Sequence, residues 1–145
     1  MAALGKHVLI ELWGCNSDIN DADSVRNAIL QAVDAVGATM LHIHVHSYSP
    51  YGVTGLAVLA ESHMSIHSWP EHGYLAADVF TCGTRTDPVK AVDVLKDAFE
   101  PEHISYEVVK RGVRPIGHKH DDHSTGSKVL QDGELEISSP ANALS

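Results

Sequence analysis

A chain of 145 residues is long enough to bury a hydrophobic core without disulfide staples, and its length favours a single domain. Its 19 Asp and Glu against 10 Lys and Arg give a net charge of -9, which argues against nucleic acid as the ligand because binding phosphates requires cations. No stretch is apolar for long enough to span a bilayer, and the first residues lack a signal-peptide pattern, so we expect a cytoplasmic protein that binds no membrane. Cys15 and Cys82 have no metal-type spacing and are expected to be free thiols.

The first half of the chain predicts a strand, a helix and a second strand. Residues 7–13 read as the strand. The helix is expected to start at a cap formed by Asp23 or Ser24 and to end at Gly37. Its apolar positions follow helical spacing, namely Val25, Ala28, Ile29, Ala32, Val33 and Val36. Residues 39–49 then alternate with the period of a strand, with Leu41, Ile43 and Val45 on the side that should meet the helix.

The second half predicts more strands around one further helix. Residues 55–62 form a nearly continuous apolar run, which is typical of a strand buried on both faces, and Ser62 ends that run. A strand over 74–82, a helix opening at Asp87 with Pro88 in its first turn and a last strand over 103–110 follow.

This order of elements favours an α+β fold in which an antiparallel sheet carries its helices on one face, as a two-layer sandwich. The other face then needs a cover, so we expect a homodimer packed sheet to sheet.

The composition changes at the carboxyl end of the chain. Residues 114–145 are rich in Pro, Gly, His, Asp and Ser and contain too few large apolar residues to offset their ordering entropy, which predicts a disordered tail after a domain over residues 1–113. Metal binding by His118, His120 and His123 is conceivable, but no rigid scaffold is evident, and solvated histidines are the favoured interpretation.

Residues 60–71 concentrate the reactive side chains. They place the hydroxyl of Ser62, two imidazoles and two carboxylates within a dozen positions, and the next strand brings the thiol of Cys82 near. Ser62 is a candidate nucleophile and His67 a candidate base. A serine at the end of a strand usually bonds to backbone, and a histidine beside tryptophan is usually packed in a core, so spacing alone leaves the question open.

A row of histidines is a second candidate for the functional site. His42, His44 and His46 project from the same face of one strand, where two imidazoles could converge on Zn²⁺. Three histidines in line are not tetrahedral, however, and no fourth ligand or supporting carboxylate can be assigned. We therefore predict no metal site and interpret the row as a polar sheet face or a subunit contact.

Three motifs occur in a fixed order along the chain. They are Tyr51-Gly52-Val53-Thr54-Gly55, then Glu61-Ser62-His63-Met64-Ser65-Ile66-His67-Ser68-Trp69-Pro70-Glu71, then Asp78-Val79-Phe80-Thr81-Cys82-Gly83. In this combination the chain resembles the small prokaryotic S-adenosylmethionine decarboxylase proenzymes, from about His7 to about Gly112. The resemblance implies a decarboxylase of polyamine and spermidine synthesis that is made as an inactive precursor and cuts its own backbone.

Decarboxylation of an amino acid needs an electron sink that ordinary side chains lack. By resemblance, Ser62 attacks the carbonyl of Glu61, the chain is cut between these two residues, and Ser62 becomes a pyruvoyl group that forms a Schiff base with the substrate. His67 matches the family's processing histidine, and Cys82 matches its catalytic proton donor.

The resemblance implies the residues that contact the substrate less directly than it implies the cleavage site. Tyr48 and Trp69 stand where aromatic rings could stack on adenine or face the sulfonium, and Glu71 could accept hydrogen bonds from the ribose of S-adenosylmethionine. All three could equally be packing residues. Thr54 departs from the serine that many members use to assist processing, and its hydroxyl remains while χ1 stiffens.

Two other functions stay open on the sequence. The same pyruvoyl chemistry could act on arginine or ornithine, and the chain could be a non-enzymatic, His-rich metal-binding domain.

Overall fold

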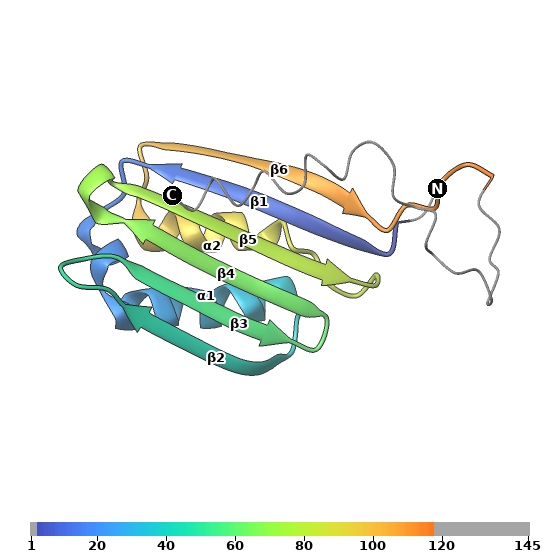
Figure 1. Cartoon of the computed structure of the whole chain (residues 1–145), viewed down its shortest axis with the longest axis horizontal. Coiled ribbons are helices and arrows are strands. Elements are labelled where there is room, and N and C mark those ends of the chain that lie inside the picture. The colour runs from blue at the N-terminus through green and yellow to red at the C-terminus, as the bar shows by residue number, and fades with distance from the viewer. Residues whose placement is uncertain (1–2, 118–145) are drawn as a thin grey trace. The chain divides into compact units, whose positions relative to one another are not determined.

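The computed structural model describes residues 3–117 of the chain. It contains one six-stranded sheet in the order β2-β3-β4-β5-β1-β6, and every neighbouring pair of strands is antiparallel. The strands are β1 (Gly5–Trp13), β2 (Met40–Ser47), β3 (Val53–Leu59), β4 (Ser62–Trp69), β5 (Tyr74–Cys82) and β6 (His103–Arg111). Figure 1 shows the two helices, α1 (Ala22–Val36) and α2 (Lys90–Phe99), lying together behind the sheet. The predicted α+β architecture with helices on one face is confirmed.

The core lies between the helices and one face of the sheet. All six apolar residues predicted from the helical spacing of α1 are buried. The strands contribute alternate side chains, among them Val8, Ile10 and Leu12 from β1 and Leu75, Ala77 and Val79 from β5. This alternation fixes the register, because a slip of one residue would turn every apolar side chain toward solvent.

The apolar run over residues 55–62 is not the doubly buried strand that the sequence predicts. β3 ends at Leu59, and its burial alternates, with Leu56 and Val58 exposed by 45% and 43%. Ser62 does not end this strand. A turn at Ala60 and Glu61 intervenes, and Ser62 begins β4, which pairs back on β3.

Helix starts also differ from the predicted positions. The carboxylate of Asp21, rather than Asp23 or Ser24, caps α1 by accepting a hydrogen bond from the backbone N–H of Ser24 at 3.0 Å. α2 begins at Lys90, because a turn precedes it in which Asp87 accepts a hydrogen bond from the N–H of Val89.

The second strand departs from regular alternation at one end. The register of β2 against β3 shifts between Met40 and His42, and Leu41, expected to face the helix, is exposed. Ile43 and Val45 do pack against the core, as predicted. His42, His44 and His46 pair with Val58, Leu56 and Thr54, so they share the face of the sheet that no helix covers.

Two short 3₁₀ helices complete the described part, η1 (Ser17–Asn20) and η2 (Pro70–His72). Within residues 3–117, no helix combines the length and the apolar composition that crossing a bilayer requires. Most of the predicted tail, including His118, His120 and His123, lies outside the described residues.

Candidate active site

The residues that the sequence singles out lie at opposite ends of β4. Ser62 opens the strand beside the end of β5, and Trp69 closes it beside the start of β5. His67 is five positions after Ser62 on this strand, so the two residues are separated by roughly 16 Å at about 3.3 Å per residue. Within one chain, the predicted nucleophile and the predicted base are therefore not in contact.

The peptide bond between Glu61 and Ser62 sits in a distorted part of the backbone. Ser62 has a φ of 153°, in a region that residues with a side chain rarely adopt. The carbonyl oxygen of Glu61 accepts a hydrogen bond from the backbone N–H of Cys82 at 3.2 Å. The carboxylate of Glu61 points elsewhere and accepts a hydrogen bond from the N–H of Thr39 at 3.0 Å. The backbone beside this bond is thus strained, and the hydrogen bond from Cys82 polarises its carbonyl.

Ser62 also contacts the next residue in the chain. Its Oγ lies 3.4 Å from Nδ1 of His63, and Nε2 of His63 lies 2.9 Å from Oδ2 of Asp78. These contacts form a continuous series of hydroxyl, imidazole and carboxylate, the arrangement that activates a serine nucleophile on many unrelated folds.

Asp78 stands at the centre of a polar cluster on the uncovered face of the sheet. Its Oδ2 also lies 2.6 Å from Nε2 of His7, and its Oδ1 accepts a hydrogen bond from the hydroxyl of Ser65. Partial burial by itself would raise the pKa of Asp78, but the hydrogen bonds from Ser65, His7 and His63 outweigh it and hold the pKa below its ordinary value. Asp78 is therefore a carboxylate at neutral pH.

The two free thiols differ in their surroundings. Cys82 is exposed at the end of β5 and lines a cavity of about 220 Å³ together with Phe80 and Arg111. Cys15 packs against the core, and burial raises its pKa to about 11. Of the two, Cys82 is the thiol that a small molecule can reach.

The far end of β4 holds a larger cavity of about 360 Å³. Its lining includes every residue that the sequence assigns to substrate contacts, with both processing residues beside them: Tyr48, Tyr51, Gly52, Thr54, His67, Ser68, Trp69 and Glu71. Thr54 and His67 face each other on adjacent strands, and Oγ1 of Thr54 lies 3.1 Å from Nδ1 of His67. The hydroxyl of Thr54 therefore orients the imidazole of His67.

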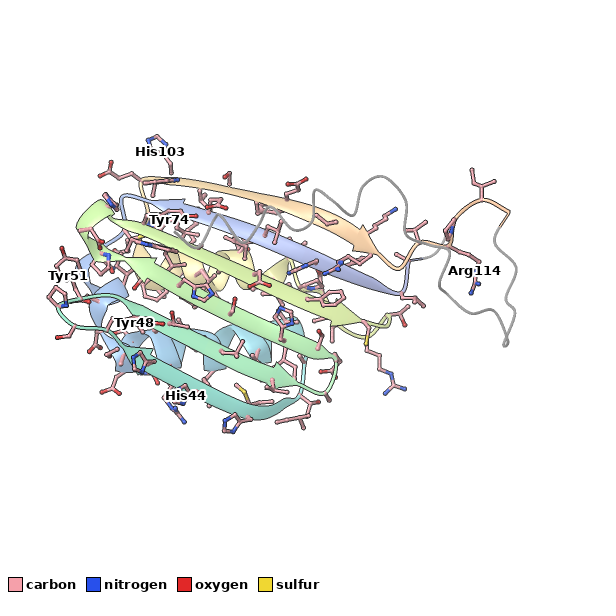
Figure 2. All side chains as sticks on the ribbon, viewed as in Figure 1. His44, Tyr48, Tyr51, Tyr74, His103 and Arg114 are labelled. Carbon is pink, nitrogen blue, oxygen red and sulfur yellow. The ribbon has the colours of Figure 1, made fainter. Side chains whose placement is uncertain are left out.

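Aromatic rings border this cavity and remain accessible. Tyr48 and Trp69 are exposed by 51% and 41%, so both rings are accessible to a ligand. The ring of Trp69 lies 5.2 Å from that of Tyr74, which supports it from β5. Figure 2 shows Tyr48 and Tyr51 at the end of the molecule where β2 turns into β3.

No role of their own was predicted for His7, His63 or Asp78 from the sequence. Strand alternation could have predicted that they share one face of the sheet. His63 and Ser65 lie on one side of β4, and Asp78 lies on the same side of β5. Only the strand register shows that Asp78 pairs with Ser65 and lies near both histidines, because β1 and β4 flank β5 from opposite sides.

His7, His63 and Asp78 form the one group within residues 3–117 whose ligand atoms are close enough to hold a metal ion. Their separations of 2.6 and 2.9 Å are those of hydrogen bonds to a shared carboxylate oxygen. The row of His42, His44 and His46 forms no such group in this part of the chain.

Comparison with known proteins gives one consistent family. A family model described as S-adenosylmethionine decarboxylase matches residues 6–112. An S-adenosylmethionine decarboxylase proenzyme of Methanococcus maripaludis is 46% identical over 78% of this chain and 93% of its own, and one from Thermomicrobium roseum is 48% identical over 78% and 97%. The crystal structure of the adenosylmethionine decarboxylase from Aquifex aeolicus superposes with a TM-score of 0.74 and 33% identity, over 83% of this chain and all of that one.

Proposed function

The chain belongs to the S-adenosylmethionine decarboxylase family, enzymes that decarboxylate S-adenosylmethionine for polyamine biosynthesis, and on this premise we propose how its residues divide the work. We propose that the chain cuts itself between Glu61 and Ser62 and that Ser62 becomes a pyruvoyl group. The relatives are named S-adenosylmethionine decarboxylase proenzymes. They therefore support neither decarboxylation of arginine or ornithine nor a non-enzymatic metal-binding role.

The geometry around the Glu61 carbonyl carries this proposal. The N–H of Cys82 lies 3.2 Å from the oxygen that would gain negative charge when Ser62 attacks. A donor already aimed at that oxygen lowers the barrier without reorganisation at the moment of reaction. The strained φ of Ser62 adds a second support, because cutting the chain releases it.

The residues at this end fit a pyruvoyl group formed in place. Its carbonyl supplies the electron sink that holds the electron pair left behind when CO₂ departs. Cys82 ends the neighbouring strand and borders a cavity, where its thiol can hold a proton for the substrate carbon. Phe80 and Arg111 line the same cavity.

The larger cavity supports binding of the nucleoside part of the substrate. Its volume of about 360 Å³ lies in the range of small-molecule sites. Tyr48 and Trp69 offer exposed ring faces for a base or a sulfonium, and Glu71 offers a carboxylate for ribose hydroxyls.

The distance along β4 supports a homodimer. Because about 16 Å separates Ser62 from His67 within the chain, His67 cannot act on its own Glu61–Ser62 bond. A second copy packed on the uncovered face, with its strands reversed, would bring its Thr54–His67 pair to Ser62 and its larger cavity to Cys82. That face exposes Leu9, Leu56 and Val58, which such packing would remove from water.

Intact-mass spectrometry of the purified chain tests the central step. We expect two fragments, residues 1–61 and 62–145, and the second should resist Edman sequencing because a pyruvoyl group has no free amine. Ser62→Ala should stay a single chain, whereas Ser105→Ala, at an exposed serine of β6, should still be cut at residue 61. A single unaltered chain of full mass after long incubation would disprove the proposal.

A further inference from the structure

We propose that His63, held by Asp78, is the base that takes the proton of Ser62 when the chain cuts itself. This inference rests on the proposed self-cleavage and assigns its first step to residues of the same chain. It leaves to His67 of the second copy the later proton transfers.

The hydrogen bonds around Asp78 fix which nitrogen of His63 carries the proton. Asp78 is a carboxylate and can only accept, so Nε2 of His63 donates to it at 2.9 Å. Nδ1 of the neutral ring is then an acceptor, and it is this atom that lies 3.4 Å from the hydroxyl of Ser62. The carboxylate also stabilises the imidazolium that forms when the proton arrives.

A second histidine holds the carboxylate in place. Nδ1 of His7 lies 3.3 Å from a guanidinium nitrogen of Arg111, which can only donate. His7 therefore carries its proton on Nε2 and donates it to Asp78 at 2.6 Å. With Ser65 on its other oxygen, Asp78 is oriented from both sides and acts as a positioning residue for His63.

The backbone explains why neighbouring residues can meet. In a regular strand, adjacent side chains point to opposite faces, so Ser62 and His63 would be kept apart. The φ of 153° at Ser62 breaks that alternation at the first position of β4 and allows the hydroxyl to approach the ring. The same distortion that strains the scissile bond thus brings the nucleophile to its base.

In the first step, the Oγ–H proton of Ser62 moves to Nδ1 of His63 while Oγ bonds to the carbonyl carbon of Glu61. The C–N bond between Glu61 and Ser62 then breaks, and the proton passes to the leaving nitrogen, which becomes an amine. The product is an ester between the Glu61 carboxyl and the Ser62 hydroxyl, with no change in oxidation state.

The decisive variant is His63→Gln. Its amide can keep a hydrogen bond to Asp78 near the former Nε2 but has no basic nitrogen facing Ser62. We expect a folded chain cut at least ~100-fold more slowly, since a general base contributes about 10²–10⁴-fold. Hydroxylamine, which splits esters but not amides, should leave this variant whole because the ester does not accumulate. His44→Gln is the matched control, with the same substitution on the same face but at the edge strand, and should be cut at the normal rate.

Two further measurements separate a base from a structural residue. Imidazole added to His63→Gly should restore part of the cleavage, since the small base can enter the space that the ring leaves. Asp78→Asn should shift the acid limb of the pH–rate profile for cleavage to lower pH, because an amide stabilises the imidazolium less than a carboxylate does.

The inference is overturned if His63→Gln is cut as fast as the unaltered chain, or if it builds up an ester that hydroxylamine splits. A stoichiometric metal ion that is lost in His63→Gln and whose removal by a chelator stops cleavage of the unaltered chain would also overturn it. Failure of the unaltered chain to cut itself would instead count against the proposed function.

Discussion

In the proposed function, the two ends of β4 carry different parts of one chemical task. At the Ser62 end, a strained peptide bond, a polarised carbonyl and the His63–Asp78 pair surround the nucleophile, and Cys82 stands on the next strand. At the Trp69 end, the larger cavity holds the Thr54–His67 pair. Figure 1 places the turn before β4 and the turn after it at opposite ends of the sheet. Neither end is a complete active site, which is the physical reason to expect two copies.

The largest expected effect is complementation between two variants that are each inactive alone. We expect neither Ser62→Ala nor His67→Ala to be cut at a normal rate alone. When both are produced together and form mixed dimers, the His67→Ala chain should be cut, because it keeps Ser62 and receives His67 from its neighbour. Mass spectrometry identifies which chain is cut. If no His67→Ala chain is cut in the mixed dimer, His67 does not act across copies.

The next largest effect is expected for Cys82, whose loss should stop decarboxylation but not self-cleavage. Cys82→Ala should still be cut but should lose about 100-fold or more of its decarboxylase activity, measured as CO₂ release from fully cut protein. Cys15→Ala is the control and should be close to normal. Iodoacetamide should modify Cys82 first, because burial raises the pKa of Cys15 to about 11 and keeps it a thiol. Normal turnover by cut Cys82→Ala would remove the thiol from the mechanism.

A moderate effect is expected at the Trp69 end. Glu71→Gln should raise KM about tenfold, as expected when a charged hydrogen-bond partner becomes neutral, and it should leave self-cleavage unchanged. His72→Gln, the neighbouring residue in η2, is the control. An unchanged KM in Glu71→Gln would show that the carboxylate does not contact the substrate.

The smallest effect concerns stability in acid at the Asp78 cluster. The pKa of Asp78 is lowered from 3.8 in the folded chain, so its contribution to folding is present above pH 4 and is lost as the pH falls through the folded pKa. Between pH 5 and pH 3, Tm should therefore drop by a few degrees more in the unaltered chain than in Asp78→Asn. Ser62→Ala should serve as the background for both, because it keeps the chain whole. Equal drops would show that the cluster does not stabilise the fold.

Elements whose residue pattern depends on local spacing were predicted correctly from the sequence. The apolar residues of α1 recur at intervals set by the helix itself, and all six predicted core positions are buried. The cap at Asp21 was missed because several adjacent side chains can accept the same hydrogen bond, and only the backbone angle at the start selects one.

The error over residues 55–62 has a different origin. A run of apolar residues is compatible with burial on both faces or with one open face, and the choice depends on what covers the sheet. The structure leaves Leu56 and Val58 on the uncovered face and starts a new strand at Ser62. Because Ser62 begins β4 and pairs with Thr81 of β5, the predicted nucleophile lies beside the end of β5 that carries Cys82.

By itself, the sequence determined the fold class and the family, because these follow from local periodicity and from motifs read along the chain. Only the tertiary structure decided that Ser62 and His67 lie apart and that Asp78 joins His63 to His7. The physical reason is that β1, β4 and β5 are distant in sequence, and their neighbourhood is set by a register that the whole core fixes.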